Sequence, residues 1–462
     1  MPEQYDVIIV GAGPAGIFTS LELVKNRPDL KILIIEKGRN IKDRACSARE
    51  QNAPCFNCSP CSITCGWGGA GAFSDGKLTL STEVGGSLEQ YLGEKNLAGM
   101  IDYIDRFYVK FGAPAQVFGL EHKEEIEDMQ RRAILSELKL IPVRIRHMGT
   151  GRCIEILQRM QDHLVSLGVE VRTSFPVREV VVKDGAVQGI VCADGQALHA
   201  KCVVLAPGRE GAGWLKQEAA RNGLETTINP VDIGVRIEVP AAVMDHLARI
   251  FYEAKFIYYS RTFNDRVRTF CMNPNGEVVL ENNDGLITVN GHSHAFNKTE
   301  NTNFAVLVSK TFTEPFKEPI AYGRYIASLA NLLGGGVLVQ SLGDLLAGRR
   351  STRERLKKCL TVPTLSEATP GDLSLVLPYR HLKGIVEMLK VLDKVAPGVY
   401  SRYTLVYGVE VKFYSSRLAL SHCLETRVKN LFAAGDGAGV TRGLAQASVS
   451  GVVAAREIMQ RV

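Results

Sequence analysis

The chain opens with a pattern of apolar runs and helical spacing that predicts a βαβ unit over residues 6–36. The run "DVIIV" (6–10) is short and apolar throughout, as in strands that are buried in a parallel sheet. Helical spacing continues to about Lys25, and a second apolar strand, "KILIIE" (31–36), follows it. Two apolar strands joined by a helix form the repeating unit of parallel sheets.

A glycine-rich turn connects the first predicted strand to the helix. The sequence "GAGPAG" (11–16) has the spacing G-x-G-x-x-G, whose glycines allow a tight turn and close approach of the backbone to a pyrophosphate. Glu36 lies twenty residues after Gly16, where a carboxylate can accept hydrogen bonds from a ribose. The pattern predicts a dinucleotide site, and a glycine turn that serves packing alone is the alternative.

Two later segments repeat the order of strand, then glycine turn. "NLFAAGDGAGVTRGLAQASVSGVVAAREIMQ" (430–460) predicts a short strand, a Gly-Asp-Gly turn and a helix of small residues. Asp436 in that turn can hydrogen-bond a ribityl hydroxyl, and the positive end of the helix suits the anionic edge of a flavin. "KCVVLAPGR" (201–209) is a further strand and turn, and residues 169–200 predict a β-meander with Asp-Gly turns.

The middle of the chain, residues 222–405, lacks the βαβ pattern. "VDIGVRIEVP" (231–240) and "RTFCMNPNGEVVL" (268–280) alternate as half-buried strands do. "GRYIASLANLLGG" (323–335) and "LKGIVEMLKVLDKVAP" (382–397) have helical spacing instead. These patterns predict a substrate domain that is inserted into the first domain.

Length and charge are those of a globular protein with two domains. The chain has 462 residues, of which 45% are hydrophobic and 23% are charged. Its formal net charge of +6 is carried by scattered residues, which does not favour nucleic-acid binding. One basic run, "GRRSTRERLKK" (348–358), is typical of a solvated helix face, with an RNA or partner site as the alternative.

The apolar runs also bear on location. None approaches the roughly 18 residues that a membrane span requires. The first residues lack the basic segment of a signal peptide. We therefore expect a cytoplasmic protein, or one whose targeting segment has been removed.

Four of the eleven cysteines lie in "CFNCSPCSITC" (55–65), which has the spacing of a ferredoxin cluster loop. In two-cluster ferredoxins the fourth cysteine binds the other cluster and a proline follows it, whereas Gly66 follows here. The ligands predicted for a single [4Fe–4S] cluster are Cys55, Cys58, Cys61 and Cys46, with Cys65 as the alternative fourth ligand. Structural zinc and inert or disulfide-forming cysteines are the other interpretations.

The cysteine run leads directly into the glycine stretch "GWGGAGAFSDGK" (66–77). Glycines let the backbone approach a planar ring closely. In the glutathione-reductase-type flavoproteins that the chain resembles, this part of the chain lies against the flavin, so the resemblance implies that the stretch holds the cysteine loop beside it. A flexible linker is the alternative. Trp67 and Phe73 disfavour it, because linkers rarely carry large aromatic residues.

The strand and turn segments together resemble the FAD domain of the glutathione-reductase-type flavoproteins. The matching residues are Gly11, Gly13, Gly16, Glu36, "LAPG" at 205–208, and Gly435-Asp436. No second strand–GxGxxG–helix unit is present, so the resemblance implies FAD without a dedicated NAD(P)H domain, as in the geranylgeranyl-reductase-like and hydroxylase-like branches. The FAD-binding residues that it implies are Gly11, Gly13, Pro14, Ala15, Gly16, Glu36, Lys37, Arg44, Val177, Ala206, Gly208, Gly435, Asp436 and Gly443.

Over its whole length the chain is similar to the uncharacterised bacterial "FAD-dependent dehydrogenase" family. The similarity lies in "GAGPAG", "GWGGAGAFSDGKLTL", "RTFCMNPNGEVV", "VNGHSHAFNKTENTNFAVL" and "GDGAGVTRGLAQASVSG". It implies an α/β fold in which a Rossmann-like FAD-binding domain carries an inserted α+β substrate domain. The expected boundaries are 1–45, 145–221 and 406–462 for the FAD domain, 46–85 for the cysteine and glycine loop, 86–144 for a helical segment, and 222–405 for the substrate domain.

Candidate catalytic residues are few. Asp75 and Lys77 follow the glycine stretch, where Lys77 could stabilise an anionic reduced flavin or an enolate. His292 and His294 would share one face of an extended segment, from which they could donate protons to a reduced substrate, or act as metal ligands that lack a third partner. Further cavity candidates are Tyr407, Glu410 and Arg442. Structural or surface roles are the alternative for each.

The function expected from this similarity is that of an FAD-dependent oxidoreductase. Electrons would enter through the cluster from a ferredoxin-like donor, and hydride transfer from the flavin would reduce a small organic substrate, such as a C=C bond. The reverse direction is equally compatible. The alternatives are an FAD hydroxylase with structural zinc, an electron-transfer or redox-sensing flavoprotein, and an RNA-modifying flavoenzyme, which would need a basic surface.

Overall fold

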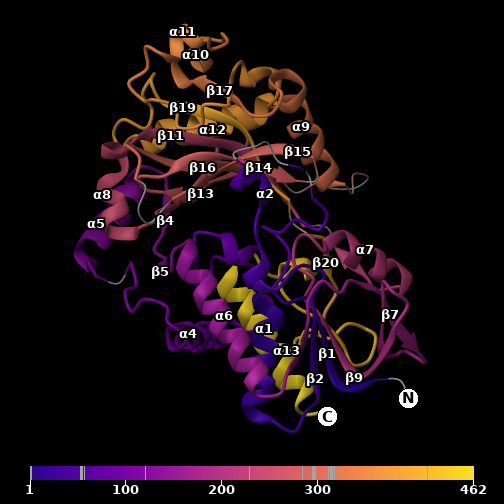
Figure 1. Cartoon of the computed structure of the whole chain (residues 1–462). Helices are drawn as coiled ribbons and strands as arrows, with labels where there is room; N and C mark the ends of the chain where they lie inside the picture. Colours follow the sequence, from indigo (N-terminus) through magenta and orange to yellow (C-terminus); the bar gives the residue numbers. More distant parts are fainter. Residues whose placement is uncertain are drawn as a thin grey trace. The chain divides into compact units, whose positions relative to one another are not determined.

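The polypeptide passes more than once through each of two structural units. A computed structural model describes residues 3–51, 56, 58–119, 121–227, 229–283, 285–293, 298–310, 312, 316, 318–413 and 415–462. Unit 1 comprises Met1–Gln116, Arg146–Asn229 and Tyr414–Val462, and unit 2 comprises Val117–Ile145 and Pro230–Phe413. Figure 1 labels many of the helices and strands of both units.

The centre of unit 1 is a parallel sheet built around β1 (Gln4–Val10). β2 (Ile32–Ile35) pairs with one edge of β1, and β9 (Ala197–Leu205) pairs with the other edge. β6 (Glu170–Arg172) extends the sheet beyond β2, and β21 (Leu431–Ala433) pairs with β9. The apolar runs of β1 and β2 are buried on both faces, as expected for parallel strands. The predicted Rossmann-like sheet is confirmed.

The β-meander that the sequence predicts is attached to the same sheet. β7 (Val177–Lys183) and β8 (Ala186–Cys192) are antiparallel, and β8 pairs with the first half of β9. Asp184 and Gly185 connect β7 to β8 with φ of 52° and 74°. Positive φ at both central positions is the geometry of the type I′ hairpin turn, which Asp-Gly favours.

Two helices from opposite ends of the chain pack together in unit 1. These are α1 (Pro14–Asn26) and α13 (Leu444–Ile458). A methyl group built on Gly451 would lie 2.1 Å from the carbonyl oxygen of Ala15, so the helix backbones touch there. The other elements of unit 1 are η1 (Ile41–Asp43), α2 (Ser47–Glu50), η2 (Gly69–Phe73), β3 (Lys77–Leu80), α3 (Glu89–Leu92), α4 (Glu94–Lys110), α6 (Thr150–Ser166), α7 (Ala212–Arg221), β10 (Thr226–Thr227), β20 (Arg417–Leu418) and η4 (Asp436–Ala438), while β5 (Arg144–His147) spans the boundary.

Unit 2 is built on an eight-stranded sheet with the order β18-β17-β19-β11-β16-β13-β12-β4. Its strands are β4 (Lys139–Ile141), β11 (Val231–Pro240), β12 (Lys255–Tyr259), β13 (Arg266–Asn273), β16 (Asn301–Lys310), β17 (Leu338–Ser341), β18 (Thr369–Pro370) and β19 (Leu405–Lys412). The hairpin of β14 (Glu277–Asn283) and β15 (Leu286–His292) is separate.

The boundaries expected from the sequence differ from these units mainly at two places, and unit 1 also extends to Asn229, whereas the substrate domain was expected to begin at 222. β19 was expected to begin the last part of the FAD domain, but it pairs with β11 and β17 in the sheet of unit 2. The helical segment 86–144 is divided, because β4 pairs with β12 while α4 packs against α13. In both cases hydrogen bonds to strands far away in sequence decide the assignment.

The two faces of the unit 2 sheet differ in chemistry. The odd-numbered residues of β11, from Val231 to Val239, belong to a buried apolar core under α8 (Ala241–Phe251), α9 (Pro319–Gly334) and α12 (Tyr379–Leu392). The even-numbered residues from Asp232 to Glu238 are equally buried but mostly charged. The β14–β15 hairpin contacts β11, β16 and β19. The remaining elements are α5 (Lys123–Leu135), α10 (Leu342–Leu346), α11 (Arg353–Leu356) and η3 (Leu373–Leu375).

No helix in the described ranges is both long enough and apolar enough to cross a bilayer.

Candidate functional site

Three loops of unit 1 meet at the carboxyl ends of its parallel strands. β1, β9 and β21 run in the same direction, so the loops that follow them leave one edge of the sheet. A methyl group built on Gly11, after β1, would lie 2.1 Å from the carbonyl oxygen of Ala206, after β9. One built on Gly437, after β21, would lie 2.6 Å from the carbonyl oxygen of Gly208. The three turns are therefore in backbone contact, at the edge where open α/β sheets bind their ligands.

The glycines of the first turn differ in their surroundings. Gly11 has φ of 109°, and a methyl group on Gly16 would lie 2.0 Å from the carbonyl oxygen of Gly11. Gly13 has an ordinary φ of −77°, and within the described residues no atom beyond its own and its two chain neighbours lies within 4 Å of the position that its side chain would take. It immediately precedes Pro14 and Ala15, the first residues of α1. Open space beside unpaired helix N–H groups is what a phosphate group requires.

Glu36, at the end of β2, is bonded to the same turn. Its carboxylate accepts hydrogen bonds from the backbone N–H of Ala12 (2.9 Å), Gly38 (2.8 Å) and Gly66 (3.0 Å). A carboxylate has about four acceptor positions, so one remains on the oxygen that faces Ala12. The carboxylate is thus held rigidly at the glycine turn with an acceptor left for a ribose hydroxyl.

Asp436 connects the carboxyl-terminal turn to the start of α13. Its Oδ1 accepts hydrogen bonds from the Thr441 hydroxyl (2.7 Å) and the Gly443 N–H (3.2 Å). The Nε of Arg209 lies 3.8 Å from its Oδ2. Gly443 immediately precedes α13, so Asp436 and the first N–H groups of that helix lie on one loop, as predicted.

The other residues predicted to bind FAD also lie in unit 1. Lys37 forms an ion pair with Glu210 of the loop after β9. Val177 begins β7 opposite Cys192, and Gly435 has φ of 78° in the turn after β21. Contact of these side chains and turns with FAD stays a prediction.

The glycine stretch after the cysteines packs against the amino-terminal turn. Gly68 N–H donates to the Ala12 carbonyl at 2.8 Å, and a methyl group on Gly69 would lie 3.3 Å from the Cα of Gly13. Trp67 is fully buried, and its indole N–H donates to the main chain of α6 at 2.8 Å. The stretch is therefore a packed part of unit 1, which excludes the flexible-linker interpretation.

Arg44 holds the cysteine loop in a way that the sequence analysis missed. Four of its N–H groups donate to carbonyl oxygens at 2.6–2.9 Å, those of Ser62, Ile63, Trp67 and Gly69. Burial lowers the pKa of the guanidinium to about 10, while the nearby Glu36, Cys65 and Cys61 act in the opposite direction. Arg44 was predicted to bind FAD; most of its donors are instead committed to the chain around Cys65, and contact with FAD stays a prediction.

The predicted cluster ligands differ in exposure. Cys58 is exposed, Cys46 and Cys61 are half-buried, and Cys65 is buried. The N–H groups of Thr64 and Cys65 donate to the Cys61 carbonyl, so Cys61 and Cys65 stand one turn apart. Burial raises the pKa of the Cys65 thiol, against the opposing charge of Lys37. Cys55 lies outside the described residues, and the residues within them form no group of three or more metal ligands.

A second polar cluster, also in unit 1, follows the glycine stretch. Lys77 and Asp75 form an ion pair of 3.3 Å and are almost buried. Burial lowers the pKa of His147, the Lys77 charge lowers it further, and Asp75 opposes both. Burial raises the pKa of the Cys153 thiol to about 12, with Asp75 adding to the effect. His147 and Cys153 escaped the sequence analysis because only the packing of Gly76 against Met148 and Cys153 brings them to Asp75.

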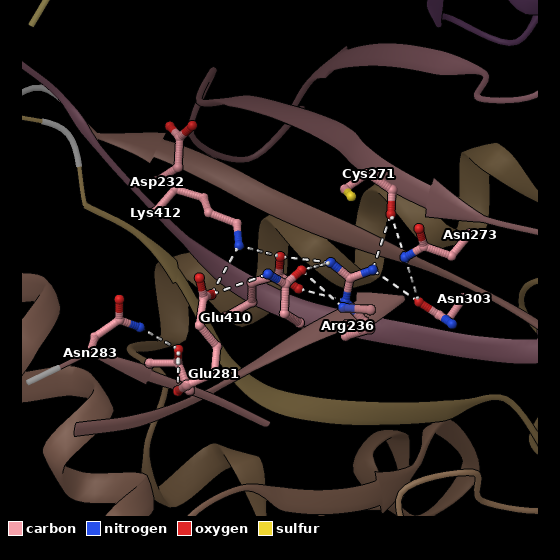
Figure 2. Close-up of polar contacts among 12 residues, drawn as sticks. Asp232, Arg236, Cys271, Asn273, Glu281, Asn283, Asn303, Glu410 and Lys412 are labelled. Carbon is pink, nitrogen blue, oxygen red and sulfur yellow. Dashed lines mark hydrogen bonds and ion pairs between the residues drawn. The ribbon is translucent and has the colours of Figure 1, made fainter. Parts of the chain in front are cut away.

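Unit 2 contains a buried charged network of its own, drawn in Figure 2. Arg236 and Glu410 are both inaccessible to solvent and form two hydrogen bonds of 2.8 Å. The remaining guanidinium N–H groups donate to the Cys271 carbonyl and to the side chains of Asn303 and Asn290. All five donors of Arg236 therefore have acceptors.

Glu410, a candidate catalytic residue, is fully engaged in this network. Lys412 approaches its Oε1 at 3.1 Å in addition to the two Arg236 bonds. Burial alone would raise its pKa, but the Arg236 and Lys412 charges outweigh burial and lower it. A carboxylate that is ionised, enclosed and bonded in this way suits a structural role better than proton transfer.

A neighbouring network involves Tyr407, another sequence candidate. Its hydroxyl donates to Glu238 at 2.5 Å, and Thr364 and Asn301 donate to the same carboxylate. Burial raises the pKa of Glu238, against those hydrogen bonds.

The remaining candidates are two histidines and an arginine. His292 ends β15 opposite Glu277, His294 lies outside the described residues, and Arg442 is exposed. Their catalytic roles stay predictions.

Comparison with known proteins identifies relatives of this chain. Residues 230–413 match the family described as "FAD-dependent protein, C-terminal domain-like", which corresponds to the longer segment of unit 2. An uncharacterized protein from Clostridium beijerinckii is 26% identical over 482 residues, covering 98% of this chain and 80% of the relative. The family description agrees with the predicted cofactor, and the relative adds no activity.

Two solved structures are similar to this chain over nearly its whole length, at low identity. The 3-ketosteroid-delta4-(5alpha)-dehydrogenase from Rhodococcus jostii RHA1 is 15% identical, with coverage of 99% and 97% of the two chains and a TM-score of 0.46. L-proline dehydrogenase from P. horikoshii is 12% identical, with coverage of 100% and 94% and a TM-score of 0.42. Similarity at this level says nothing about the substrate.

Proposed function

We propose that this chain is an FAD-dependent oxidoreductase that acts on a small organic substrate. The observation that carries the proposal is the arrangement at the carboxyl edge of the unit 1 sheet. There, three glycine turns meet, Glu36 is held with one acceptor free, and the space beside Gly13 is open. The family match of residues 230–413 to FAD-dependent proteins supports the same cofactor.

The residues at this edge suit the separate parts of FAD. The open space at Gly13 and the start of α1 would take the pyrophosphate. Glu36 would accept from the adenosine ribose, and Asp436 with the start of α13 would face the ribityl chain and the flavin edge. Bound FAD would supply the hydride and electron transfer, and the protein would bind and orient the reactants.

Gly13→Ala tests the proposal most directly. A methyl group has room in the free chain and φ is ordinary, so folding should be unaffected. In the FAD complex it would occupy the space of the pyrophosphate, and we expect FAD to bind at least about tenfold more weakly. The measurements are the flavin content of the purified protein and titration of the free chain with FAD.

Gly213→Ala is the matched control, because Gly213 in α7 also has no atom within 4 Å of its missing side chain. It should bind FAD like the parent chain. If Gly13→Ala binds FAD as tightly as the parent, the pyrophosphate does not lie at this turn. If the parent chain neither contains nor binds FAD, the proposed function is wrong.

We further propose that the cysteine loop binds a [4Fe–4S] cluster that exchanges electrons between a ferredoxin-like donor and the flavin. The spacing of the cysteines supports this, and so does the charge of Arg44 beside Cys61 and Cys65. The described residues do not themselves bring three ligands together. Reduction of a C=C bond is the reaction we propose for the substrate.

Metal analysis of protein purified without oxygen tests the cluster. We expect about four iron and four sulfide per FAD. Cys58→Ser should lose the iron and keep FAD, while Cys359→Ser, outside the loop, should keep both. Stoichiometric zinc would contradict the cluster and favour a hydroxylase with a structural metal; no metal at all would make the cysteines structural or thiol-reactive.

A further inference from the structure

The connection between β17 and β18 in unit 2 carries an unusual concentration of charge. We call Arg349, Arg350, Arg353, Arg355, Lys357 and Lys358 the basic tip. All six side chains are exposed, on or next to α11, which Figure 1 labels together with α10. Residues 342–362 contain two carboxylates, Asp344 and Glu354, and a third, Glu367, follows shortly before β18.

One of these carboxylates is buried beneath the connection and pairs with two of the six cations, which leaves four without such a partner among the described residues. Asp344 is buried and bonds Arg349 at 2.7 Å, Arg355 at 3.4 Å and the Ser351 hydroxyl at 2.8 Å. Burial would raise its pKa, but these partners lower it, so the carboxylate is ionised and fixes two arginines in place. Arg350, Arg353, Lys357 and Lys358 form no ion pair within 4 Å in the described part of the chain, and the exposed Glu354 carboxylate interacts with Lys357 and Arg353 only at longer range.

Aliphatic side chains are exposed at both ends of the basic tip. Leu346 is 47% exposed, Leu360 is 75% exposed and Val362 is 71% exposed. Leu346 ends α10, which packs against β17 and is thereby fixed to the sheet. Exposed apolar residues beside cations are the combination that binds to the surface of a bilayer, where aliphatic chains enter the headgroup region and cations meet anionic lipids.

The composition of the stretch separates this partner from others. Residues 346–362 contain neither an aromatic residue nor methionine. Single-stranded nucleic acids are bound by stacking on aromatic rings, and the cores of protein interfaces are enriched in aromatic residues and methionine and depleted of lysine. Neither class fits as well as a lipid surface.

We propose that the basic tip, with Leu346, Leu360 and Val362, binds the anionic surface of a phospholipid bilayer. The contact would be peripheral and reversible, because it combines short aliphatic side chains with charge attraction that salt screens. This inference is independent of the flavin chemistry, since all of its residues lie in unit 2 and none belongs to the proposed FAD site.

Vesicle sedimentation with the full chain, carrying whatever cofactor it retains, tests the proposal. We expect binding to phosphatidylcholine vesicles that contain about 30% phosphatidylglycerol, release in high salt, and no binding to phosphatidylcholine alone. Reversing Arg350, Arg353 and Lys357 to Glu should weaken binding at least about tenfold. L360S/V362S should weaken it about threefold to tenfold, because the aliphatic contribution is lost.

Matched variants keep the result interpretable. Reversal of Lys123, Arg131 and Arg132 to Glu makes the same change of charge on exposed residues of α5, and L332S/L333S removes two exposed leucines of α9. Both controls should bind vesicles like the parent chain and melt at the same temperature. Equal loss in the α5 control would mean that overall charge, and not the basic tip, drives binding. Failure of the parent chain to bind, or capture of RNA instead of vesicles, would overturn the proposal.

Discussion

Glu36 in unit 1 and Glu410 in unit 2 are both nearly inaccessible carboxylates, yet their surroundings differ in kind. Glu36 is held by three backbone N–H groups and keeps an acceptor at the edge of an open glycine turn. Glu410 is enclosed by Arg236 and Lys412, and Arg236 in turn has all five of its donors bonded (Figure 2). A region built to receive a ligand leaves hydrogen-bonding capacity and space unused, whereas a region built to hold strands together uses both.

The largest expected effect comes from breaking the closed network. Arg236→Met would leave Glu410 buried without its main partner, which costs about 3–5 kcal/mol. Amide hydrogen exchange in β11 and β16 measures this as a loss of protection in unit 2. The double variant R236M/E410M removes both charges of the pair and leaves Lys412 with Glu281 at 3.5 Å, so it should recover part of the loss.

The same experiment can contradict the structural role that we assign to the Arg236–Glu410 pair. If R236M/E410M is as unstable as the single variant, the shape of the side chains and not the charge pair holds the strands. If R236M leaves exchange unchanged, the network is not structural, and Arg236 would have to be considered as a ligand-binding residue.

His381 is another buried titratable group of unit 2, and it differs from Glu410. Its titration in acid gives a second test of the comparison. His381 is 2% exposed, and neither ring nitrogen has a hydrogen-bond partner among the residues that the structure describes. Burial lowers its pKa to about 4, with the Lys310 and Arg380 charges acting in the same direction and Asp265 opposing them. Since the folded pKa lies below the unfolded value, stability contributed by the neutral ring falls as the pH drops from about 6.5 to 4, by about 3 kcal/mol in total.

His381→Leu should abolish this part of the acid sensitivity. Hydrogen exchange in α12 at neutral and mildly acidic pH measures it, with the parent chain losing protection in acid and the variant losing less. An identical pH dependence in both proteins would mean that another group controls the acid response of unit 2.

Local sequence patterns predicted most of unit 1. The apolar runs and glycine spacings fix β1, α1, β2 and the Asp-Gly hairpin, because a short-range pattern specifies each of them. The position of β19 in unit 2 could not be predicted, since its pairing with β11 joins residues more than 160 apart. Periodicity predicts that a segment forms a strand, but it does not predict which other strand it pairs with.

Local sequence patterns also could not predict which groups the polar side chains bond. The bonds from Arg44 to the cysteine loop depend on main-chain carbonyls, which no side-chain pattern reveals. Two motifs quoted for their family resemblance, "RTFCMNPNGEVV" and "VNGHSHAFNKTENTNFAVL", supply Asn290, Asn303 and the Cys271 carbonyl to Arg236. These two motifs therefore correspond to a packed polar layer in unit 2 at least as much as to a catalytic site.

Glu36→Gln should have the smallest effect. It tests whether the cofactor uses the hydrogen-bond acceptor that Glu36 keeps. Glutamine keeps the length of the side chain but turns an amide NH₂ toward backbone N–H donors, so at least one hydrogen bond to a charged acceptor is lost, at about 1.5–3 kcal/mol. Part of that loss falls on the free chain, because Ala12, Gly38 and Gly66 are bonded without any ligand. Only the remainder should appear in FAD affinity, which we expect to fall about tenfold by titration. If Glu36→Gln destabilises unit 1 and leaves FAD affinity unchanged, Glu36 is as closed as Glu410, and the acceptor that it keeps is not used by the cofactor.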